Sequence, residues 1–465
     1  MTVWSVFKAL DTLHATATGL DEVPAWFLRL GAAVFAMPLA QLINLSVSTS
    51  VVPSQWKRAS ICPVPKTASP RELSDFRPIS ITPVLSRVTE RLIVRHFLYP
   101  AFISQSSSLI FTDQYAFCPT GSTTAALISI FATITSLLAC NDYVVVVALD
   151  FSKAFDTVRH STLLAKMAQL NLPDTVFNWL VDYFRGHEHC TQFNGTTSAM
   201  LPITASIVQG SAVGPASYVV NAADLTTVSS TNQLVKYADD TYLIIPASNI
   251  ETRAAELDHL EQWAAANNLK LNRRKSTEIV FVDPRRRRSV VPPSPLTGVS
   301  RVSSMKMLGV TVTKTLSMAE HVKAIIHNCA SSLHALRVLR SHGLNDAALQ
   351  TVYRAAVVTR LTYAISAWWG FTTADDRQRI ERFLRRGTRS GFYRPDWPSV
   401  EILAEDAADA LFRRVLGNRN HLLHLLLPDK NRHGYDLRHR RHGRILASNH
   451  DQRNFIDRQL HKDSY

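Results

Sequence analysis

Hydrophobic and polar positions change their period along the chain, and these changes predict its helices and strands. Apolar residues recur three or four positions apart in several segments, which predicts helices over residues 25–51, 83–99, 173–185 and 250–264. Residues 143–149 instead form a near-continuous, mostly β-branched run, which is typical of a central strand covered on both faces. Pro63 and Pro65 lack backbone donors, so the segment around them is expected to be an edge strand or an extended loop.

Two further places show the pattern of β-hairpins. Asn194-Gly195 lies between two short alternating runs, which is a hairpin signal. The apolar runs 234–237 and 242–245 flank Asp239-Asp240, so the sequence predicts a tight hairpin with two carboxylates at its tip.

The remaining pattern decides the fold class. Residues 277–282 are expected to form a strand, residues 283–304 a connector, and the chain beyond residue 317 is expected to be helical. This order of elements predicts an α+β fold with an antiparallel sheet at its core, rather than a doubly wound parallel sheet.

Composition and charge narrow the class of protein. The 465 residues are 46% hydrophobic, which is ordinary for a globular protein and excludes wholesale disorder. The formal charge of +14 favours a polyanionic partner, either nucleic acid or an anionic membrane. The five scattered cysteines contain no CxxC, so a disulfide framework is not expected. We expect no signal peptide and no membrane span, since apolar stretches such as residues 144–149 fall short of the ~20 residues that a span needs.

Three aspartates are candidates for phosphoryl-transfer chemistry. Asp150 ends the predicted central strand, and Asp239 and Asp240 tip the predicted hairpin. If these elements are neighbours at a strand spacing of about 4.8 Å, the three carboxylates converge, and hard oxygen ligands suit Mg²⁺ or Mn²⁺. A lone aspartate at a strand end is usually a turn former, and Asp375-Asp376 is explained more simply as a charge pair at a helix N-terminus. The pair alone is therefore weak evidence.

The surrounding motifs resemble those of reverse transcriptases from non-LTR (LINE-type) retrotransposons, from about residue 20 to about residue 322. The motifs appear in the order of that family and read WKRASICPVPK, DFRPIS, QYAFCPTGSTTAAL, VALDFSKAFDTV, VQGSAVGP, KYADD, LNRRKSTEIVF and MKMLGVTV. Their shared order and spacing make a chance agreement very improbable. CPTGSTT lacks the basic residue often found before its Ser-Thr pair, and Ala212 and Val213 replace larger aliphatic residues.

The resemblance implies a right-hand polymerase architecture with fingers, an antiparallel-sheet palm, a helical thumb and a basic helical C-terminal extension. The corresponding boundaries are 1–140 for an N-terminal extension and fingers, 141–316 for the palm with part of the fingers inserted, 317–395 for the thumb, and 396–465 for the extension. Residues 321–395 contain twelve lysines and arginines against four acidic residues, as expected of a surface that grips a hybrid duplex through its phosphates.

The resemblance also implies roles for the residues of the reacting centre. Asp150, Asp239 and Asp240 would be the catalytic metal ligands for Mg²⁺ or Mn²⁺. Phe155 would be the bulky gate that clashes with a ribose 2′-hydroxyl, although a core aromatic is the alternative. Lys275 would be the catalytic acid that protonates the leaving pyrophosphate, although a solvated lysine remains an equal alternative.

Further residues match positions that contact the nucleotide or the primer. Lys66 and Arg77 would hold the triphosphate, unless they are ordinary solvated cations. Gln209 and Gly210 would shape the nucleotide pocket, where glycine allows close approach of the backbone. Two more matches concern the primer: Tyr237 would pack near its end, and Leu308-Gly309 would form a hairpin that grips it. Asp156 is expected to be the cap of a helix that starts at Thr157 rather than a metal ligand.

These expectations favour an RNA-directed DNA polymerase that uses an RNA template, a DNA primer or target, and dNTPs. The alternatives are a degenerate remnant that binds RNA or DNA without catalysis and an RNA-templated RNA polymerase, which Phe155 disfavours. Only about 140 residues precede Asp150, so an endonuclease is not expected in this chain, nor an RNase H domain after residue 395. An enzyme of this kind is expected inside the cell, in the nucleus, where its target DNA lies.

Overall fold

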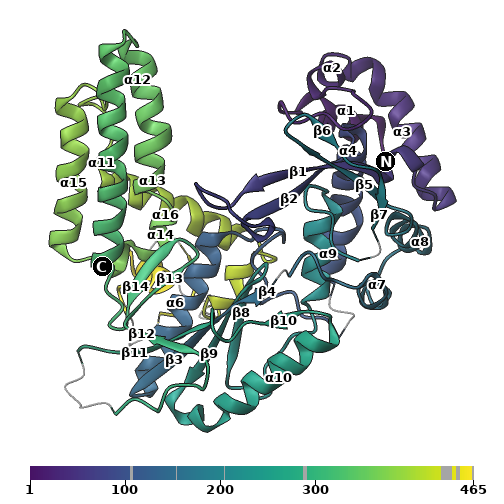
Figure 1. Cartoon of the computed structure of the whole chain (residues 1–465). Coiled ribbons are helices and arrows are strands. Elements are labelled where there is room, and N and C mark those ends of the chain that lie inside the picture. The colour runs from purple at the N-terminus through teal and green to yellow at the C-terminus, as the bar shows by residue number, and fades with distance from the viewer. Residues whose placement is uncertain are drawn as a thin grey trace. The chain divides into compact units, whose positions relative to one another are not determined.

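The computed structural model describes residues 1–104, 108–152, 154–203, 205–285, 291–430, 442–446 and 451–462 (Figure 1). The described chain divides into two compact units that interleave along the sequence. Unit 1 comprises Met1–Pro119, Phe151–Thr226 and His259–Leu271. Unit 2 comprises Thr120–Asp150, Thr227–Asp258 and Asn272–Tyr465.

Unit 1 contains a mixed sheet whose strands come from two distant parts of the sequence. Its strands are β1 (Arg58–Pro65), β2 (Phe76–Ile81), β5 (Glu188–Phe193), β6 (Thr196–Thr197) and β7 (Leu201–Pro202). Strand β1 pairs with β2 antiparallel and with β5 parallel. The hairpin predicted at Asn194-Gly195 is confirmed by the pairing of β5 with β6. A separate short ladder joins β4 (Phe151–Ser152) and β10 (Lys270–Leu271).

Helices account for much of the rest of Unit 1. They are α1 (Val3–Asp11), α2 (Ala25–Leu30), α3 (Ala32–Thr49), α4 (Val84–Ile93), α5 (Tyr99–Ile103), α7 (His160–Met167), α8 (Asp174–Tyr183) and α9 (Val213–Asn221), while α10 (Arg253–Ala266) includes residues of both units. The helix predicted over 25–51 is confirmed with a break at Gly31. The helix predicted to start at Thr157 was wrong, because residues 154–156 form a turn and α7 begins only at His160.

Unit 2 is built on a sheet with strand order β12-β11-β3-β9-β8. Its strands are β3 (Tyr143–Leu149), β8 (Gln233–Tyr237), β9 (Asp240–Pro246), β11 (Thr277–Val282) and β12 (Ser300–Val302). The β-branched run predicted to be a central strand is the middle strand β3, and Val144 to Val147 are fully buried. Every pairing is antiparallel except that of β11 with β12, so the structure confirms the α+β class and the antiparallel core.

Helix α6 (Thr123–Cys140) contacts β3, β8 and β9, and most of its side chains are buried. A hairpin of β13 (Ser304–Met307) and β14 (Val310–Thr313) follows the sheet. The C-terminal half is helical as predicted, with α11 (Ala319–Ser341), α12 (Asp346–Tyr353), α13 (Thr359–Leu361), α14 (Ile365–Trp368), α15 (Ala374–Arg389), α16 (Val400–Gly417) and α17 (Phe455–His461).

Within the described residues, α3 and α6 are long and apolar enough to cross a membrane, judged by length and composition alone. The expectation that apolar stretches fall short of that length was therefore wrong, because small and polar residues interrupt the runs in the sequence without making the helices hydrophilic. Most of α6 is buried inside Unit 2, which is how a core helix behaves, whereas α3 lies near the N-terminus and is less buried.

Candidate active site

The strand register of Unit 2 brings the three predicted aspartates together. Strand β3 pairs antiparallel with β9 so that Leu149 faces Thr241, and the next position along each strand places Asp150 opposite Asp240. Strands β8 and β9 form a tight hairpin in which Tyr237 pairs with Asp240. Asp239 lies in the two-residue turn of this hairpin. The convergence predicted from the sequence is therefore present.

The electrostatics show that these carboxylates act on one another. Partial burial, together with the charges of Asp239 and Asp150, raises the pKa of Asp240 to about 6. Like charges that crowd in this way disfavour the ionised form, and a cation among them would reverse the effect. The backbone of Asp150 is held in place from both sides, since its N–H donates to Ser276 Oγ (3.2 Å) and its carbonyl accepts from Asn272 N–H (2.8 Å).

The carboxylates of Asp150, Asp239 and Asp240 fit a hard divalent cation whose remaining ligands come from water and from the substrate's phosphates. In the part of the chain that the structure describes, no three histidine, cysteine or carboxylate side chains form a ready-made metal cage. Mg²⁺ rarely occupies such a cage, because it keeps several waters and is held by one or two carboxylates plus phosphate oxygens. Asp150, Asp239 and Asp240 together offer carboxylate oxygens at one strand edge, and the raised pKa of Asp240 shows that negative charge is crowded there.

Two other predicted residues of Unit 2 lie beside this locus. Lys275 is exposed in the turn before β11, the same turn whose Asn272 and Ser276 hold the backbone of Asp150. Tyr237 is the last residue of β8, directly before the turn that carries Asp239. Burial and the nearby Tyr363 and Asp240 raise the pKa of the Tyr237 phenol, so it stays protonated as a donor.

Leu308 and Gly309 form the two-residue turn between β13 and β14, which confirms the predicted hairpin. Both have positive φ angles, of 45° for Leu308 and 90° for Gly309. Two tyrosines that the sequence did not single out hold this turn: Leu308 N–H donates to Tyr242 Oη (3.2 Å), and Tyr363 Oη donates to the Leu308 carbonyl (3.0 Å). No motif connects these residues, so only the structure reveals the contacts.

In Unit 1, the two predicted triphosphate contacts lie on the β1–β2 hairpin. Lys66 directly follows β1 and Arg77 lies on β2, and both side chains are exposed. The Lys66 ammonium donates to the carbonyl of Ser74 (2.8 Å), and its backbone N–H donates to the carbonyl of Asp75 (2.7 Å). These contacts keep the lysine on the hairpin with an accessible charge.

Gln209 and Gly210 form a turn that touches the end of β2. The Ser80 N–H donates to the Gln209 carbonyl (2.6 Å), and a Cβ built on Gly210 would lie 2.1 Å from the Ser80 carbonyl oxygen. With a φ of 127°, Gly210 occupies a position that only glycine can fill. The prediction that Asp156 caps a helix was wrong, because its Oδ1 accepts from Gln209 Nε2 (2.7 Å) and so joins the Gln209-Gly210 turn.

Phe155 lies next to this turn and is half-buried. Its ring stacks on Tyr218 of α9, with centroids 4.4 Å apart and planes 20° apart. Its carbonyl accepts from Ile207 N–H (2.8 Å), which ties the segment around Phe155 to the irregular chain just before Gln209. Phe155 therefore lies between surface and core: Tyr218 packs against one face of its ring, and part of the side chain stays exposed.

A comparison with protein-family models identifies the chain. The model described as "Reverse transcriptase (RNA-dependent DNA polymerase)" matches residues 64–312, which is more than half of the chain. The chain belongs to the reverse transcriptase family. The matched range contains every residue placed above in the aspartate locus and in the Gln209-Gly210 turn.

Relatives among curated proteins confirm the resemblance to non-LTR retrotransposons. A probable RNA-directed DNA polymerase from transposon BS of Drosophila melanogaster is 28% identical over 83% of this chain and 44% of that protein. The RNA-directed DNA polymerase from the mobile element jockey of the same species is 27% identical over 62% of this chain and 32% of its own length. A probable polymerase from the transposon X-element matches 79% of this chain at 26% identity. This reverse transcriptase chain spans less than half the length of these relatives.

Among solved structures, telomerase from Candida tropicalis in complex with a fragment of telomeric RNA aligns with a TM-score of 0.42 at 12% identity. The alignment covers 77% of this chain and 62% of the telomerase chain. Apo telomerase from the same organism gives a TM-score of 0.41 at 13% identity over 76% of this chain and 66% of that chain.

Membership in the reverse transcriptase family indicates in general terms what the site must bind. Reverse transcriptases use divalent metal ions, an RNA template and nucleotide substrates. Exposed basic side chains on the helices after residue 317 provide matching charge for a polyanion. Those on α11 to α15 are Lys323, Arg337, Arg354, Arg360, Arg382, Arg385, Arg386 and Arg389; Arg394, just after α15, and Arg413 and Arg414 on α16 are exposed as well.

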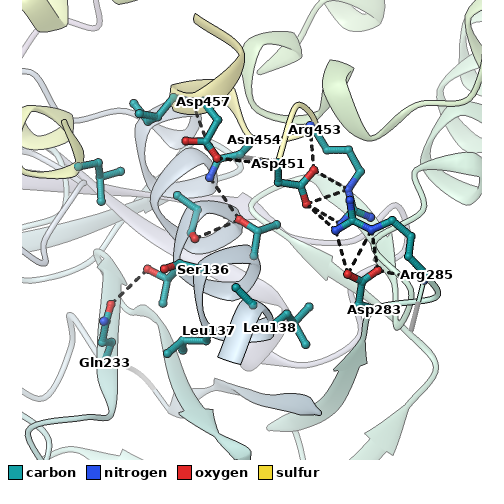
Figure 2. A pocket seen from close by; sticks show the side chains of 16 residues that line it. Ser136, Leu137, Leu138, Gln233, Asp283, Arg285, Asp451, Arg453, Asn454 and Asp457 are labelled. Carbon is teal, nitrogen blue, oxygen red and sulfur yellow. Dashed lines mark hydrogen bonds and ion pairs between the residues drawn. The ribbon is translucent and has the colours of Figure 1, made fainter. Parts of the chain in front are cut away.

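A separate polar pocket of about 770 Å³ in Unit 2 lies between α6, the end of β11 and the segment before α17 (Figure 2). Its charged side chains pair with one another: Arg285 donates to Asp283 (2.8 Å) and to Asp451 (3.1 Å), and Arg453 donates to Asp451 (2.6 Å). The hydrogen bonds from Arg285 lower the pKa of Asp283. This network joins the C-terminal segment to the sheet and contains none of the predicted site residues.

Proposed function

We propose that this chain is an RNA-directed DNA polymerase of a non-LTR retrotransposon that adds dNTPs to the 3′-hydroxyl of a primer. The observation that carries the proposal is the register that sets Asp150 opposite Asp240 beside Asp239. Because the chain spans less than half of its curated relatives, their named activity supports the proposal without replacing it. The intact set of aspartates argues against a degenerate remnant.

The aspartates would hold the divalent ions. Asp150, Asp239 and Asp240 offer oxygen ligands on one strand edge, and their crowding makes cation binding favourable. Bound Mg²⁺ or Mn²⁺ supplies charge that lowers the pKa of an attacking hydroxyl and stabilises the leaving pyrophosphate. Lys275, in the turn whose Asn272 N–H donates to the Asp150 carbonyl, would give a proton to that leaving group.

The nucleotide contacts of Unit 1 would select and orient the dNTP. Lys66 and Arg77 provide exposed positive charge for the triphosphate. Phe155, held by its stack on Tyr218, would occlude the space of a 2′-hydroxyl and so favour deoxynucleotides. The absence of a Cβ at Gly210 lets the backbone of Ser80 lie directly against the turn, and this close fit would fix the shape of the nucleotide pocket.

The remaining residues would bind the nucleic acid strands. Tyr237 and the Leu308-Gly309 turn, held by Tyr242 and Tyr363, would support the DNA primer. The basic helices α11 to α15 would act as the thumb, through phosphate contacts that carry no sequence preference. Action on chromosomal target DNA would place the protein in the nucleus.

Primer extension on an RNA template tests the proposal. We expect the wild-type chain to incorporate dNTPs, to lose activity when EDTA removes divalent ions, and to regain it with Mg²⁺ or Mn²⁺. Asp239→Asn should abolish incorporation while leaving primer–template binding intact. An inactive wild type that still binds nucleic acid in a salt-dependent manner would support the non-catalytic alternative. Equal incorporation of rNTPs and dNTPs would support the RNA-polymerase alternative.

A further inference from the structure

A buried glutamate lies directly behind the nucleotide-binding turn. Glu90 on α4 has 1% of its surface exposed. Its Oε2 accepts from the backbone N–H of Ala212 (2.7 Å) and of Val213 (3.2 Å), and its Oε1 accepts from Ser86 Oγ (2.8 Å). The two amides belong to the residue before α9 and to the first residue of α9. Glu90, which lies on α4, therefore caps the N-terminus of α9 by accepting hydrogen bonds from its free amides.

The chemistry of Glu90 indicates a specific role rather than generic packing. A buried carboxylate is costly, and burial raises the pKa of Glu90. Among the described residues, Glu90 makes no ion pair. Its ionised form is favoured instead by the hydroxyl of Ser86, by the two amides and the positive end of the α9 dipole, and by the neighbouring hydroxyl of Tyr183. An apolar residue would fill the space at less cost but would leave the two amides without an acceptor.

Helix α9 links Glu90 to both predicted nucleotide contacts of Unit 1. Gln209 and Gly210 end only two residues before Ala212, so the amides that Glu90 holds fix the exit of the nucleotide-binding turn. Five residues after Val213, on the same helix, Tyr218 supports Phe155 through the 4.4 Å ring stack. A shift of the N-terminal end of α9 would therefore move both the turn and the support of the gate.

We propose that Glu90 is a positioning residue that fixes α9, and through α9 the Gln209-Gly210 turn and the Phe155–Tyr218 stack. Glu90 would act on nucleotide binding and sugar selection through the backbone of Ala212 and Val213, whose N–H groups donate to its carboxylate. This inference rests on the proposed function, because it assigns the turn to the dNTP.

The kinetic test compares Glu90→Gln and Glu90→Ala with a matched control. In Glu90→Ala, losing the acceptor of two buried amides should raise the KM for dNTP about tenfold and lower the preference for dNTP over rNTP, with kcat changed by less than about threefold. Glu90→Gln should retain most function, because its amide oxygen still accepts the two N–H groups and its NH₂ can donate to Ser86. The affinity for primer–template should not change in either variant.

Glu256 supplies the control, because it is fully buried in Unit 2 and also accepts from two backbone amides, Val228 N–H (2.9 Å) and Ser229 N–H (2.9 Å). Glu256→Ala should destabilise the protein without raising the KM for dNTP or changing sugar preference. An equal rise of KM in Glu256→Ala and Glu90→Ala would overturn the proposal, because generic loosening would then explain both.

Hydrogen exchange separates this inference from the proposed function and needs no activity. In Glu90→Ala, exchange should accelerate in the peptide that spans residues 209–218 and stay unchanged in the peptide that carries Asp239. Unchanged exchange over residues 209–218 would overturn the inference. If the wild type fails to extend a primer, the proposed function is refuted, and the exchange rates alone then support or overturn the structural role of Glu90.

Discussion

The aspartate locus of Unit 2 and the Gln209-Gly210 turn of Unit 1, which we propose binds the nucleotide, are built in different ways. Regular strands set the first: the antiparallel register of β3, β9 and β8 brings Asp150, Asp239 and Asp240 together, and the backbone of Asp150 is further held by Ser276 Oγ and by the N–H of Asn272. The second lies in irregular chain, and single contacts from distant segments hold it, above all Glu90 to the amides at α9 and Ser80 to Gln209.

This difference predicts which properties a substitution in each region should change. A substitution at the aspartate locus should remove chemistry and leave the strands intact, because their ladders do not depend on those side chains. A substitution at the turn should change nucleotide affinity, selectivity and local stability together, because the same contacts build the turn and shape the pocket. The following predictions test this contrast.

The largest effect is expected from Asp150→Asn. Removing one metal-binding carboxylate should lower kcat at least about 1000-fold, while the free energy of unfolding stays equal or rises, because repulsion among three acidic groups is relieved. Single-turnover primer extension and urea unfolding measure the two quantities. Asp375→Asn, at an exposed position in the first turn of α15, is the control and should retain wild-type kcat. A variant that loses activity and stability together would contradict the claim that the strands do not depend on the carboxylate side chains.

A smaller effect is expected at the gate. Phe155→Val should lower the preference for dNTP over rNTP roughly 10- to 100-fold, because a small side chain leaves room for the 2′-hydroxyl. The ratio of kcat/KM for the two nucleotide types measures it. Phe184→Val removes a buried aromatic of the same unit, packed against Tyr183 and His160, and should lower stability without changing that ratio. If both variants change selectivity alike, Phe155 is only a core residue.

The sequence predicts the locus better than the turn for a physical reason. Strands are predicted by the β-branched run that ends at Asp150, and a tight hairpin is predicted by the two apolar runs around Asp239-Asp240. The pairing of these strands then brings the three carboxylates together. The contacts of Glu90, Tyr218 and Asp156 follow no period, since they join segments more than 50 residues apart through side chains.

The failed prediction for Asp156 illustrates this limit. An aspartate before a threonine and an apolar segment has the local pattern of a helix cap, but Gln209 binds its carboxylate and the helix begins four residues later, at His160. In the same way, Glu90 lies within an ordinary amphipathic helix pattern, and nothing in its neighbours along the chain marks it as buried. A residue's local pattern cannot show which distant amide it will accept from.

An intermediate effect is expected from Gly210→Ala. The new Cβ would lie 2.1 Å from the Ser80 carbonyl oxygen at a φ of 127°, so the turn must shift. We expect a loss of about 2 kcal/mol of unfolding free energy and a raised KM for dNTP. Gly195→Ala is the matched control, since Gly195 also has a positive φ, of 78°, but has no atom within 4 Å of its Cβ position. It should cost about 1 kcal/mol from backbone strain alone and leave KM unchanged. Equal KM values in both variants would contradict the close fit of the turn.

The smallest effect concerns pH and uses one buried histidine in each unit. Burial lowers the pKa of His187 in Unit 1 and of His321 in Unit 2 to about 4. Both stay neutral in the folded protein at neutral pH, whereas in the unfolded chain they take up protons below about pH 6.5. The stability that they contribute is therefore complete above pH 6.5 and is lost as the pH falls towards 4, by about 1 kcal/mol for each histidine at pH 6.

Hydrogen exchange at pH 7 and pH 6, corrected for the intrinsic rates, measures this loss separately in the two units. His321→Phe should flatten the pH dependence in the helices around Trp368, which His321 contacts edge-on, and leave that of Unit 1 unchanged. The reverse pattern should follow from His187→Phe, since its ring lies edge-on to Tyr183 in Unit 1. If either variant flattens the pH dependence of both units, the units unfold as one body, and the Gln209-Gly210 turn would then share the stability of the strands that carry the aspartates.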